Sequence, residues 1–265
     1  MNIPKYVELF GKELKLKRYS ENTIRNYECC LKLFLDKMNY SEPKKISESA
    51  IKEYLTKLPS VSQLKQNIGC LKLFYKFVIR QPLKFKHIEY PRKERRLPEI
   101  LSHTEVMNMI NRCTNLKHKA IIMMLYSAGF RVSELINLKV TDIDSAQMII
   151  RIKKGKGGKD RIVPLSENVL KLLREYWLSY RPVEYLFNGQ NALQYSAGSI
   201  RAILKQNSDK HIYPHLLRHS CFSQMLASGG NLRDIQNIAG HNSIKTTTLY
   251  IHTNNEYISR ITTPV

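Results

Sequence analysis

Six side chains in the second half of the chain could together cleave a phosphodiester bond without a metal ion. Such cleavage needs cations around a phosphate that gains negative charge, a nucleophile, a proton donor for the leaving oxygen and a proton acceptor. A tyrosine, whose ordinary pKa is about 10, becomes a nucleophile only beside cationic neighbours, and three or four cations can replace a metal. The candidates are Arg131, Lys156, His215, Arg218, His241 and Tyr250.

The first candidate arginine has a glycine before it and a carboxylate after it. In YSAGFRVSELINL, Arg131 follows Gly129 by two residues and precedes Glu134 by three. Glycine permits a close turn, and residues three apart share one face of a helix. A carboxylate in that place can orient a guanidinium for bidentate contact with a phosphate. Alone, the pair is more often a surface ion pair, because such pairs are common on helices.

The second candidate arginine belongs to PHLLRHS, where His215 and Arg218 are again three residues apart. Pro214 suits the first position of a helix, so both side chains should lie near a positive helix end that attracts phosphate. This pair is also weak evidence alone, because histidines often satisfy local polar contacts. His219 is the next histidine along, and we interpret it as a core or supporting residue.

The remaining candidates lie in a basic loop and near the end of the chain. Lys156 and Lys159 lie in KKGKGGKDR, whose glycines allow close approach to another backbone, although a solvated charge run is the plainer interpretation. His241 follows Gly240, which suits the end of a helix, and Tyr250 comes nine residues later. The chain has 15 tyrosines, so Tyr250 is a candidate only because of the other candidate residues that precede it in the sequence.

The first part of the chain, from residue 6 to residue 80, is helical by pattern. Ser20 and Ser47 precede amphipathic runs, and a third run covers 63–78, so we expect about four helices in residues 1–88. The segment IEYPRKERRLPEIL then combines two prolines with a basic cluster, which predicts a linker over 89–101.

The second part, residues 102–265, positions the candidate residues. Ser102 is suited to begin a helix, and helical runs follow at 117–127 and 132–139. MIIRIKKGKGGKDRIVPL changes to β-branched strands around a basic glycine-rich turn, which predicts an antiparallel hairpin with Lys156 at its tip. Helical patterns resume to residue 240. The fold class is therefore mostly α with a small antiparallel β-hairpin or sheet.

Charge and cysteine content limit the kinds of partner and ligand that the chain is expected to bind. The 265 residues carry a formal charge of +21, more than solubility needs, and more than half of the excess lies in the first 98 residues. Nucleic acid is the expected partner, and the chain has no long apolar stretch for a membrane. The first residues lack a secretory signal, so we expect a cytoplasmic protein. Five cysteines without a CxxC pair predict reduced core residues, with neither zinc nor disulfides.

The ordered set is more specific than any of its members. RVSEL, GKGGKDR, HLLRH, GH and a tyrosine nine residues later resemble the catalytic signature of the tyrosine recombinase (phage integrase) family over residues 102–256. The helical first part resembles that family's SAM-like core-binding domain, and the length is similar to that of Xer-like members. The resemblance implies a two-domain, C-shaped DNA clamp that breaks and rejoins DNA with no cofactor and no metal.

The resemblance also implies how the phosphate is held. Arg131 and Arg218 would clamp the scissile phosphate, and Glu134 would support the first of these arginines. His241 would donate a further hydrogen bond to a non-bridging oxygen.

Proton transfer and assembly follow from the same resemblance. Lys156 would protonate the departing 5′ oxygen, and His215 would assist proton removal from Tyr250, which would form a 3′-phosphotyrosyl link. The expected partner is double-stranded DNA with inverted half-sites, bound by a homo-tetramer whose short tails, after Tyr250, dock onto neighbouring subunits. A partner recombinase or accessory protein is possible within this scheme.

Other functions stay open at this point. A DNA-binding protein without catalysis would explain the charge but not the ordered set, and a type IB topoisomerase would share the chemistry but not the short tail. A metal-dependent nuclease needs clustered carboxylates, and Asp142 and Asp144 in TDIDS are predicted to form a turn. Among recombinases, housekeeping resolution of chromosome dimers and integration of a mobile element are equally compatible with the sequence.

Overall fold

The structure, a computed structural model, describes residues 3–39, 42–92, 99–153, 160–190, 192–241 and 243–250. The chain divides into two compact units, Met1–Arg95 and Arg96–Val265. The predicted tip of the hairpin, which carries Lys156 and Lys159, and the tail after Tyr250 lie outside the described residues. In the part of the chain that the structure describes, no helix is long and apolar enough to cross a bilayer.

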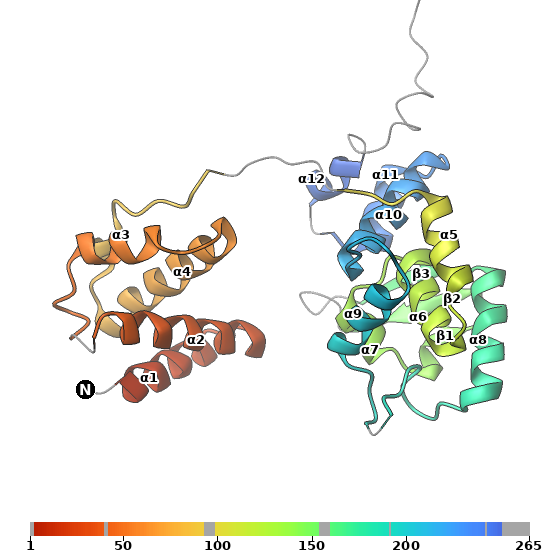
Figure 1. Cartoon of the computed structure of the whole chain (residues 1–265), viewed down its shortest axis with the longest axis horizontal. Helices are drawn as coiled ribbons and strands as arrows, with labels where there is room; N and C mark the ends of the chain where they lie inside the picture. Colours follow the sequence, from red (N-terminus) through yellow and green to blue (C-terminus); the bar gives the residue numbers. More distant parts are fainter. Residues whose placement is uncertain are drawn as a thin grey trace, which may run out of the picture. The chain divides into compact units, whose positions relative to one another are not determined.

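The first unit is helical throughout, as predicted (Figure 1). Its elements are α1 (Ile3–Leu16), α2 (Glu21–Lys37), α3 (Glu48–Thr56), α4 (Val61–Phe74), a π-helical turn (Tyr75–Ile79) and a 3-10 turn (Pro82–Phe85). The side chains of Ser20 and Ser47 accept hydrogen bonds from backbone N–H groups three residues on, which confirms both predicted helix starts. Helix α1 packs against α2, and α2 packs against α4 around the buried rings of Phe10, Phe34 and Phe74.

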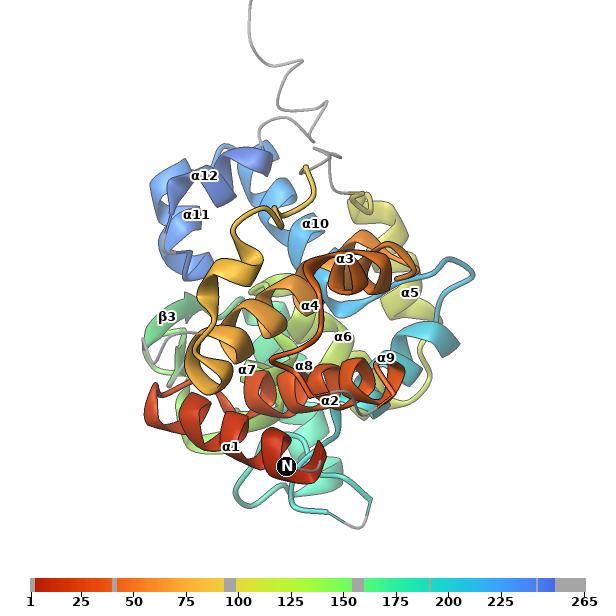
Figure 2. The same ribbon diagram turned by 90° about the vertical axis from the view of Figure 1, so that its left-hand side faces the viewer.

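The second unit is built around α6 (Leu116–Ser127), which is buried along most of its length. It packs against five other helices: α5 (His103–Arg112), α7 (Val132–Asn137), α8 (Glu167–Tyr180), α9 (Ala197–Gln206) and α10 (Pro214–Ala227). Ser102 caps α5 in a capping box with Glu105, as its place in the sequence predicts. Helix α10 is followed by α11 (Leu232–Ala239), and α11 by α12 (Ile244–Thr247); Figure 2 shows α11 and α12 next to each other.

The predicted hairpin is present and gains a third strand. Strands β2 (Ile149–Ile152) and β3 (Arg161–Pro164) pair antiparallel, with Ile150 opposite Val163 and Ile152 opposite Arg161. Strand β1 (Ile143–Asp144) pairs with β2 on its other edge, so the sheet order is β1-β2-β3. Ile150, Ile152 and Val163 are buried, which fixes the sheet face that packs on the helices.

Two predictions about individual residues were wrong. Asp144 does not lie in a turn: it forms part of β1, while Asp142 ends a short 3-10 helix (Val140–Asp142). Asp142 accepts hydrogen bonds from the backbone and ammonium groups of nearby lysines, and Asp144 binds Arg151, so each carboxylate stabilises the sheet region. The cysteines were predicted to be core residues, but Cys29 is exposed on α2 and is not a core residue.

Candidate active site

The turn that carries the first arginine depends on Gly129. This glycine has φ +58°, and a Cβ at its position would lie 2.5 Å from the ring of Phe222. Arg131 follows in extended conformation as the N-cap of α7. The prediction that Arg131 and Glu134 share one face of a helix was therefore wrong. Instead Glu134 reaches back from the first turn: its Oε2 accepts from the Arg131 backbone N at 2.8 Å and its Oε1 accepts from Arg131 Nη1 at 2.7 Å. The pairing itself is confirmed.

A second arginine binds the same carboxylate, and sequence analysis gave it no role. Arg161, the first residue of β3, donates through Nη1 and Nη2 to the two oxygens of Glu134, and its Nε donates to the Ile238 carbonyl at 2.7 Å. Burial by itself would raise the pKa of Glu134, but the hydrogen bonds and charge of Arg161, with those of Arg131, hold that pKa below its usual range. The alternation of side chains along a strand could have indicated that Arg161 points inward, because it lies on the same face of β3 as buried Val163.

Arg218 lies in the middle of the site on α10, which begins at Pro214 as predicted. Its side chain is 1% exposed. The guanidinium donates to the backbone carbonyls of Gly129 and Ala239, and it lies 4.8 Å from the ring centre of Phe222. Burial, followed by repulsion from other arginines nearby, lowers the pKa of Arg218 to about 10, so the group remains cationic at neutral pH.

The two histidines of α10 lie next to each other, and one of them contacts the tyrosine. The rings of His215 and His219 are 4.7 Å apart, and His219 Nδ1 lies 3.2 Å from the Tyr250 hydroxyl. His219, which sequence analysis interpreted as a core or supporting residue, therefore contacts the phenol directly. Tyr250 is 1% exposed, and its burial, partly offset by the charge of Arg218, raises its pKa to about 12.

His241 completes the group of side chains. It follows Gly240, which ends α11 in left-handed conformation (φ +61°) as predicted. His241 Nε2 lies 3.4 Å from Arg218 Nη2, and its Nδ1 lies 3.1 Å from the Thr247 hydroxyl. Burial, and then the charge of Arg218, lowers the pKa of His241 to about 4, so this ring is neutral near pH 7.

The structure thus brings five of the six candidates together: Arg131, His215, Arg218, His241 and Tyr250. Arg131 Nη2 and Arg218 Nη2 both donate to the Ala239 carbonyl, which places the two guanidiniums side by side. A groove of about 570 Å³ has Arg131 and His215 among its lining residues, so the site borders a space that a ligand can enter. Lys156 lies outside the described residues.

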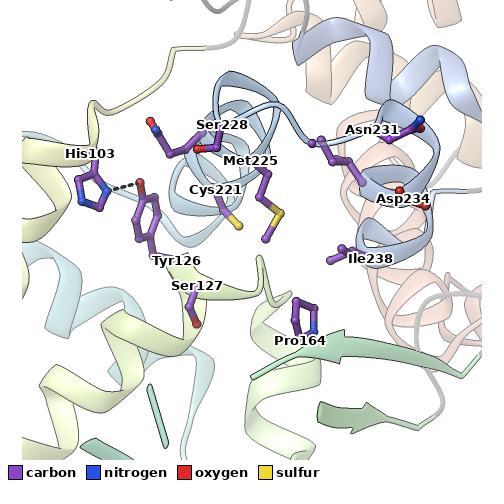
Figure 3. Close-up of a pocket in the computed structure, with 13 residues that line it drawn as sticks. His103, Tyr126, Ser127, Pro164, Cys221, Met225, Ser228, Asn231, Asp234 and Ile238 are labelled. Carbon is purple, nitrogen blue, oxygen red and sulfur yellow. Dashed lines mark hydrogen bonds between the residues drawn. The ribbon is translucent and has the colours of Figure 1, made fainter. Parts of the chain in front are cut away.

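A separate groove of about 480 Å³ lies between α5, α10 and α11 (Figure 3). Its lining includes Cys221, Met225 and Ile238, and a hydrogen bond of 3.2 Å joins His103 to the Tyr126 hydroxyl at its edge. None of the candidate site residues lines this groove. Among the residues that the structure describes, no group of three His, Cys, Asp or Glu side chains is arranged to hold a metal ion.

Comparison with known proteins agrees with this geometry. The model of the phage integrase family matches residues 97–256, and the model of the phage integrase N-terminal SAM-like domain matches residues 7–85. The tyrosine recombinase XerA of Pyrococcus horikoshii is 34% identical over 259 residues, which cover 92% of this chain and 87% of XerA.

Solved structures give the same result for the fold. A crystal structure of XerA recombinase is 31% identical with a TM-score of 0.56, over 97% of this chain and 96% of that one. A crystal structure of a lambda integrase (75-356) dimer bound to a COC′ core site has a TM-score of 0.74 at 14% identity, over 93% of this chain and 97% of that one.

Proposed function

Since the chain belongs to the phage integrase family, the tyrosine recombinases that cleave and rejoin DNA strands through a tyrosine intermediate, we propose that Tyr250 is the residue that forms this intermediate. The observation that carries the proposal is the position of its hydroxyl. It lies 3.2 Å from His219 Nδ1, and its ring is 6.2 Å from that of His241, which is itself 3.4 Å from Arg218. A histidine nitrogen thus contacts the phenol, and the charge of Arg218 favours its deprotonated form.

In the proposed reaction, Arg131 and Arg218 bind the non-bridging oxygens of the scissile phosphate. Their charges stabilise the additional negative charge of the transition state, and Glu134 and backbone carbonyls already orient the two guanidiniums. His241 donates a hydrogen bond to one of the same oxygens. Because attack requires about 3–3.5 Å between the reacting atoms, the buried phenol of Tyr250 turns toward the groove when DNA binds.

The covalent step conserves the energy of the phosphodiester bond. The Tyr250 oxygen attacks phosphorus, the bond from phosphorus to the 5′ oxygen breaks, and a 3′-phosphotyrosyl link and a 5′ hydroxyl result. The phenol proton leaves through the α10 histidines, with His215 as the proposed acceptor and His219 as the hydrogen-bond partner that the phenol already has. We assign protonation of the leaving 5′ oxygen to Lys156. Attack by a 5′ hydroxyl of another strand reverses the step and rejoins the DNA.

The substrate is double-stranded DNA, for which the charge of +21 supplies phosphate contacts. The lambda integrase fragment and XerH are both seen with DNA. In the proposed organisation, residues 1–88 form a DNA-binding domain, 89–101 a linker and 102–265 the catalytic domain. Inverted half-sites then bind paired subunits in a tetramer, with the chain acting in the cytoplasm alone or with a second recombinase or accessory protein.

The test is the capture of a covalent complex. Nicked suicide duplexes, cut from the DNA that flanks the coding sequence, are incubated with protein in EDTA and resolved on a denaturing gel. Wild type should give a protease-sensitive adduct, Tyr250→Phe should give none, and Tyr180→Phe, an exposed tyrosine of α8, should behave as wild type. An adduct of equal yield with Tyr250→Phe would assign the chemistry to another residue.

A further inference from the structure

The carboxylate that supports the first arginine is shared between two cations. The side chain of Glu134 is 3% exposed, and each of its two oxygens accepts two hydrogen bonds. Arg131 supplies one side-chain and one backbone N–H, while Arg161 supplies a guanidinium fork. The three side chains therefore form one buried cluster with a single negative and two positive charges.

The two arginines of this cluster are not equivalent. Arg161 is 7% exposed at its side chain, and each of its three nitrogens donates to protein, because Nε binds the Ile238 carbonyl and the fork binds Glu134. Arg131 is 18% exposed and lines the groove. Arg131 also donates through Nη1 to Glu134 and through Nη2 to backbone carbonyls, but of these two arginines it is the more exposed and the one that lines the groove.

A carboxylate held by a bidentate guanidinium cannot rotate freely, so Arg161 fixes the plane of Glu134. That plane determines where Oε1 and Oε2 lie, and these atoms in turn hold the side chain and backbone of Arg131. Arg161 also reaches the end of α11, since its Cδ would lie 3.1 Å from a Cβ at Gly240, directly before His241. One side chain therefore connects β3, α7 and the end of α11.

Charge gives Arg161 a second effect. Glu134 alone would neutralise Arg131, and a neutral pair would attract a phosphate weakly. With Arg161 present, the cluster carries a net positive charge, and its field extends to Arg218, whose pKa it helps to lower. The supporting carboxylate can thus orient Arg131 without cancelling the charge that the phosphate requires.

We propose that Arg161 is a positioning residue for strand cleavage: it holds Glu134 so that Arg131 faces the scissile phosphate, and it offsets the charge of Glu134. Resting on the proposed function, this inference adds a residue that acts through Arg131 and does not touch DNA. Arg161→Lys removes the fork but keeps the charge, whereas Arg161→Gln removes both. Misplacement of a reacting group by about 1 Å costs on the order of 100-fold in rate, so we expect a loss of about 10- to 100-fold for Arg161→Lys and a larger one for Arg161→Gln.

The matched control is Arg151→Lys. Arg151 lies on the neighbouring strand β2 and binds Asp144 at 3.0 Å, but its side chain is 44% exposed and it has no contact with Glu134 among the described bonds. Single-turnover cleavage of a suicide duplex and the DNA dissociation constant are measured for each variant. Arg151→Lys should match wild type in both, and Arg161→Lys should lose cleavage while its dissociation constant stays within about threefold of wild type, because binding is spread over many phosphates.

A double-variant cycle with Arg131→Lys distinguishes positioning from general damage. If Arg161 acts through Arg131, the double variant cleaves no more slowly than Arg131→Lys alone, and thermal unfolding of the protein without DNA shows coupling between the two changes. Losses that multiply, with no coupling in unfolding, would overturn the proposal. Wild type that forms no adduct would instead contradict the proposed function, and the unfolding cycle would still decide whether Arg161 and Arg131 act as one unit.

Discussion

Replacement of Gly129 by alanine tests the packing of the site without removing any of its polar groups. The new Cβ would stand 2.5 Å from Phe222 Cζ and 2.9 Å from its Cε1, which is far closer than van der Waals contact. Phe222 cannot retreat easily, because it is fully buried and its ring lies 5.7 Å from that of Tyr250 and 4.8 Å from the guanidinium of Arg218. The clash therefore displaces the residues that carry out the proposed chemistry.

The expected loss of stability has two parts. A left-handed conformation costs a residue with a Cβ about 1–2 kcal/mol, and overpacking of a filled core costs about 1–3 kcal/mol. For a unit of this size each kcal/mol lowers the melting temperature by about 2–4 °C, so a total cost of about 2–5 kcal/mol for Gly129→Ala should lower it by about 4–20 °C. Cleavage should fall with it, because the Gly129 carbonyl is an acceptor for Arg218.

Scanning calorimetry measures this effect, and two further variants isolate its cause. Gly198→Ala is the control, because that glycine is exposed in α9 and a Cβ there would meet only Ser196 Oγ at 3.6 Å. It should leave stability unchanged or raise it by up to about 1 kcal/mol. In a Phe222→Leu background the steric part should shrink, leaving the backbone part alone. Equal melting temperatures for Gly129→Ala and wild type would refute this description of the turn.

Three other expectations concern the charged groups of the site. Arg131→Ala and Arg218→Ala should abolish cleavage in the adduct gel while leaving salt-sensitive DNA binding largely intact, and a parallel loss of binding would contradict the clamp role. The pKa of Glu134 is lower in the folded than in the unfolded protein, so its contribution to stability is complete above the unfolded pKa of about 4.5 and is lost as the pH falls through the folded value. Glu134→Gln should therefore make the melting temperature depend less on pH in that range. An unchanged dependence on pH would contradict the role given to Glu134. His241 binds its proton near pH 6.5 unfolded but near pH 4 folded, so acidification through that interval should destabilise wild type more than His241→Asn, as unfolding at a series of pH values would show.

The helices, their starting points and the hairpin could be predicted from sequence because their determinants are local. Ser20, Ser47 and Ser102 each cap the helix that follows, and β-branched residues on either side of the glycine-rich turn pair as strands. Gly129 and Gly240 are also local cases, since each has a positive φ that glycine adopts without strain.

The missed parts of the site depend on contacts between distant segments. Arg161 lies 27 residues from Glu134, and a periodic pattern could place it on an inward face but could not name its partner. His215 and His219 are one turn apart on α10, and only the path of the chain after α11 brings the Tyr250 hydroxyl to His219. Arg131 was expected to share a helical face with Glu134, but it is extended after the turn at Gly129 and forms the cap of α7.

The central claim is that Tyr250 carries the DNA, and the most direct measurement is the chemical identity of the bond. The covalent complex, trapped in EDTA on a suicide duplex, is digested with protease and nuclease, and the residual nucleotide is located by tandem mass spectrometry. The expected product is a 3′-phosphate joined to the peptide that contains Tyr250. A nucleotide on any other residue, or a 5′-phosphate link, would contradict it.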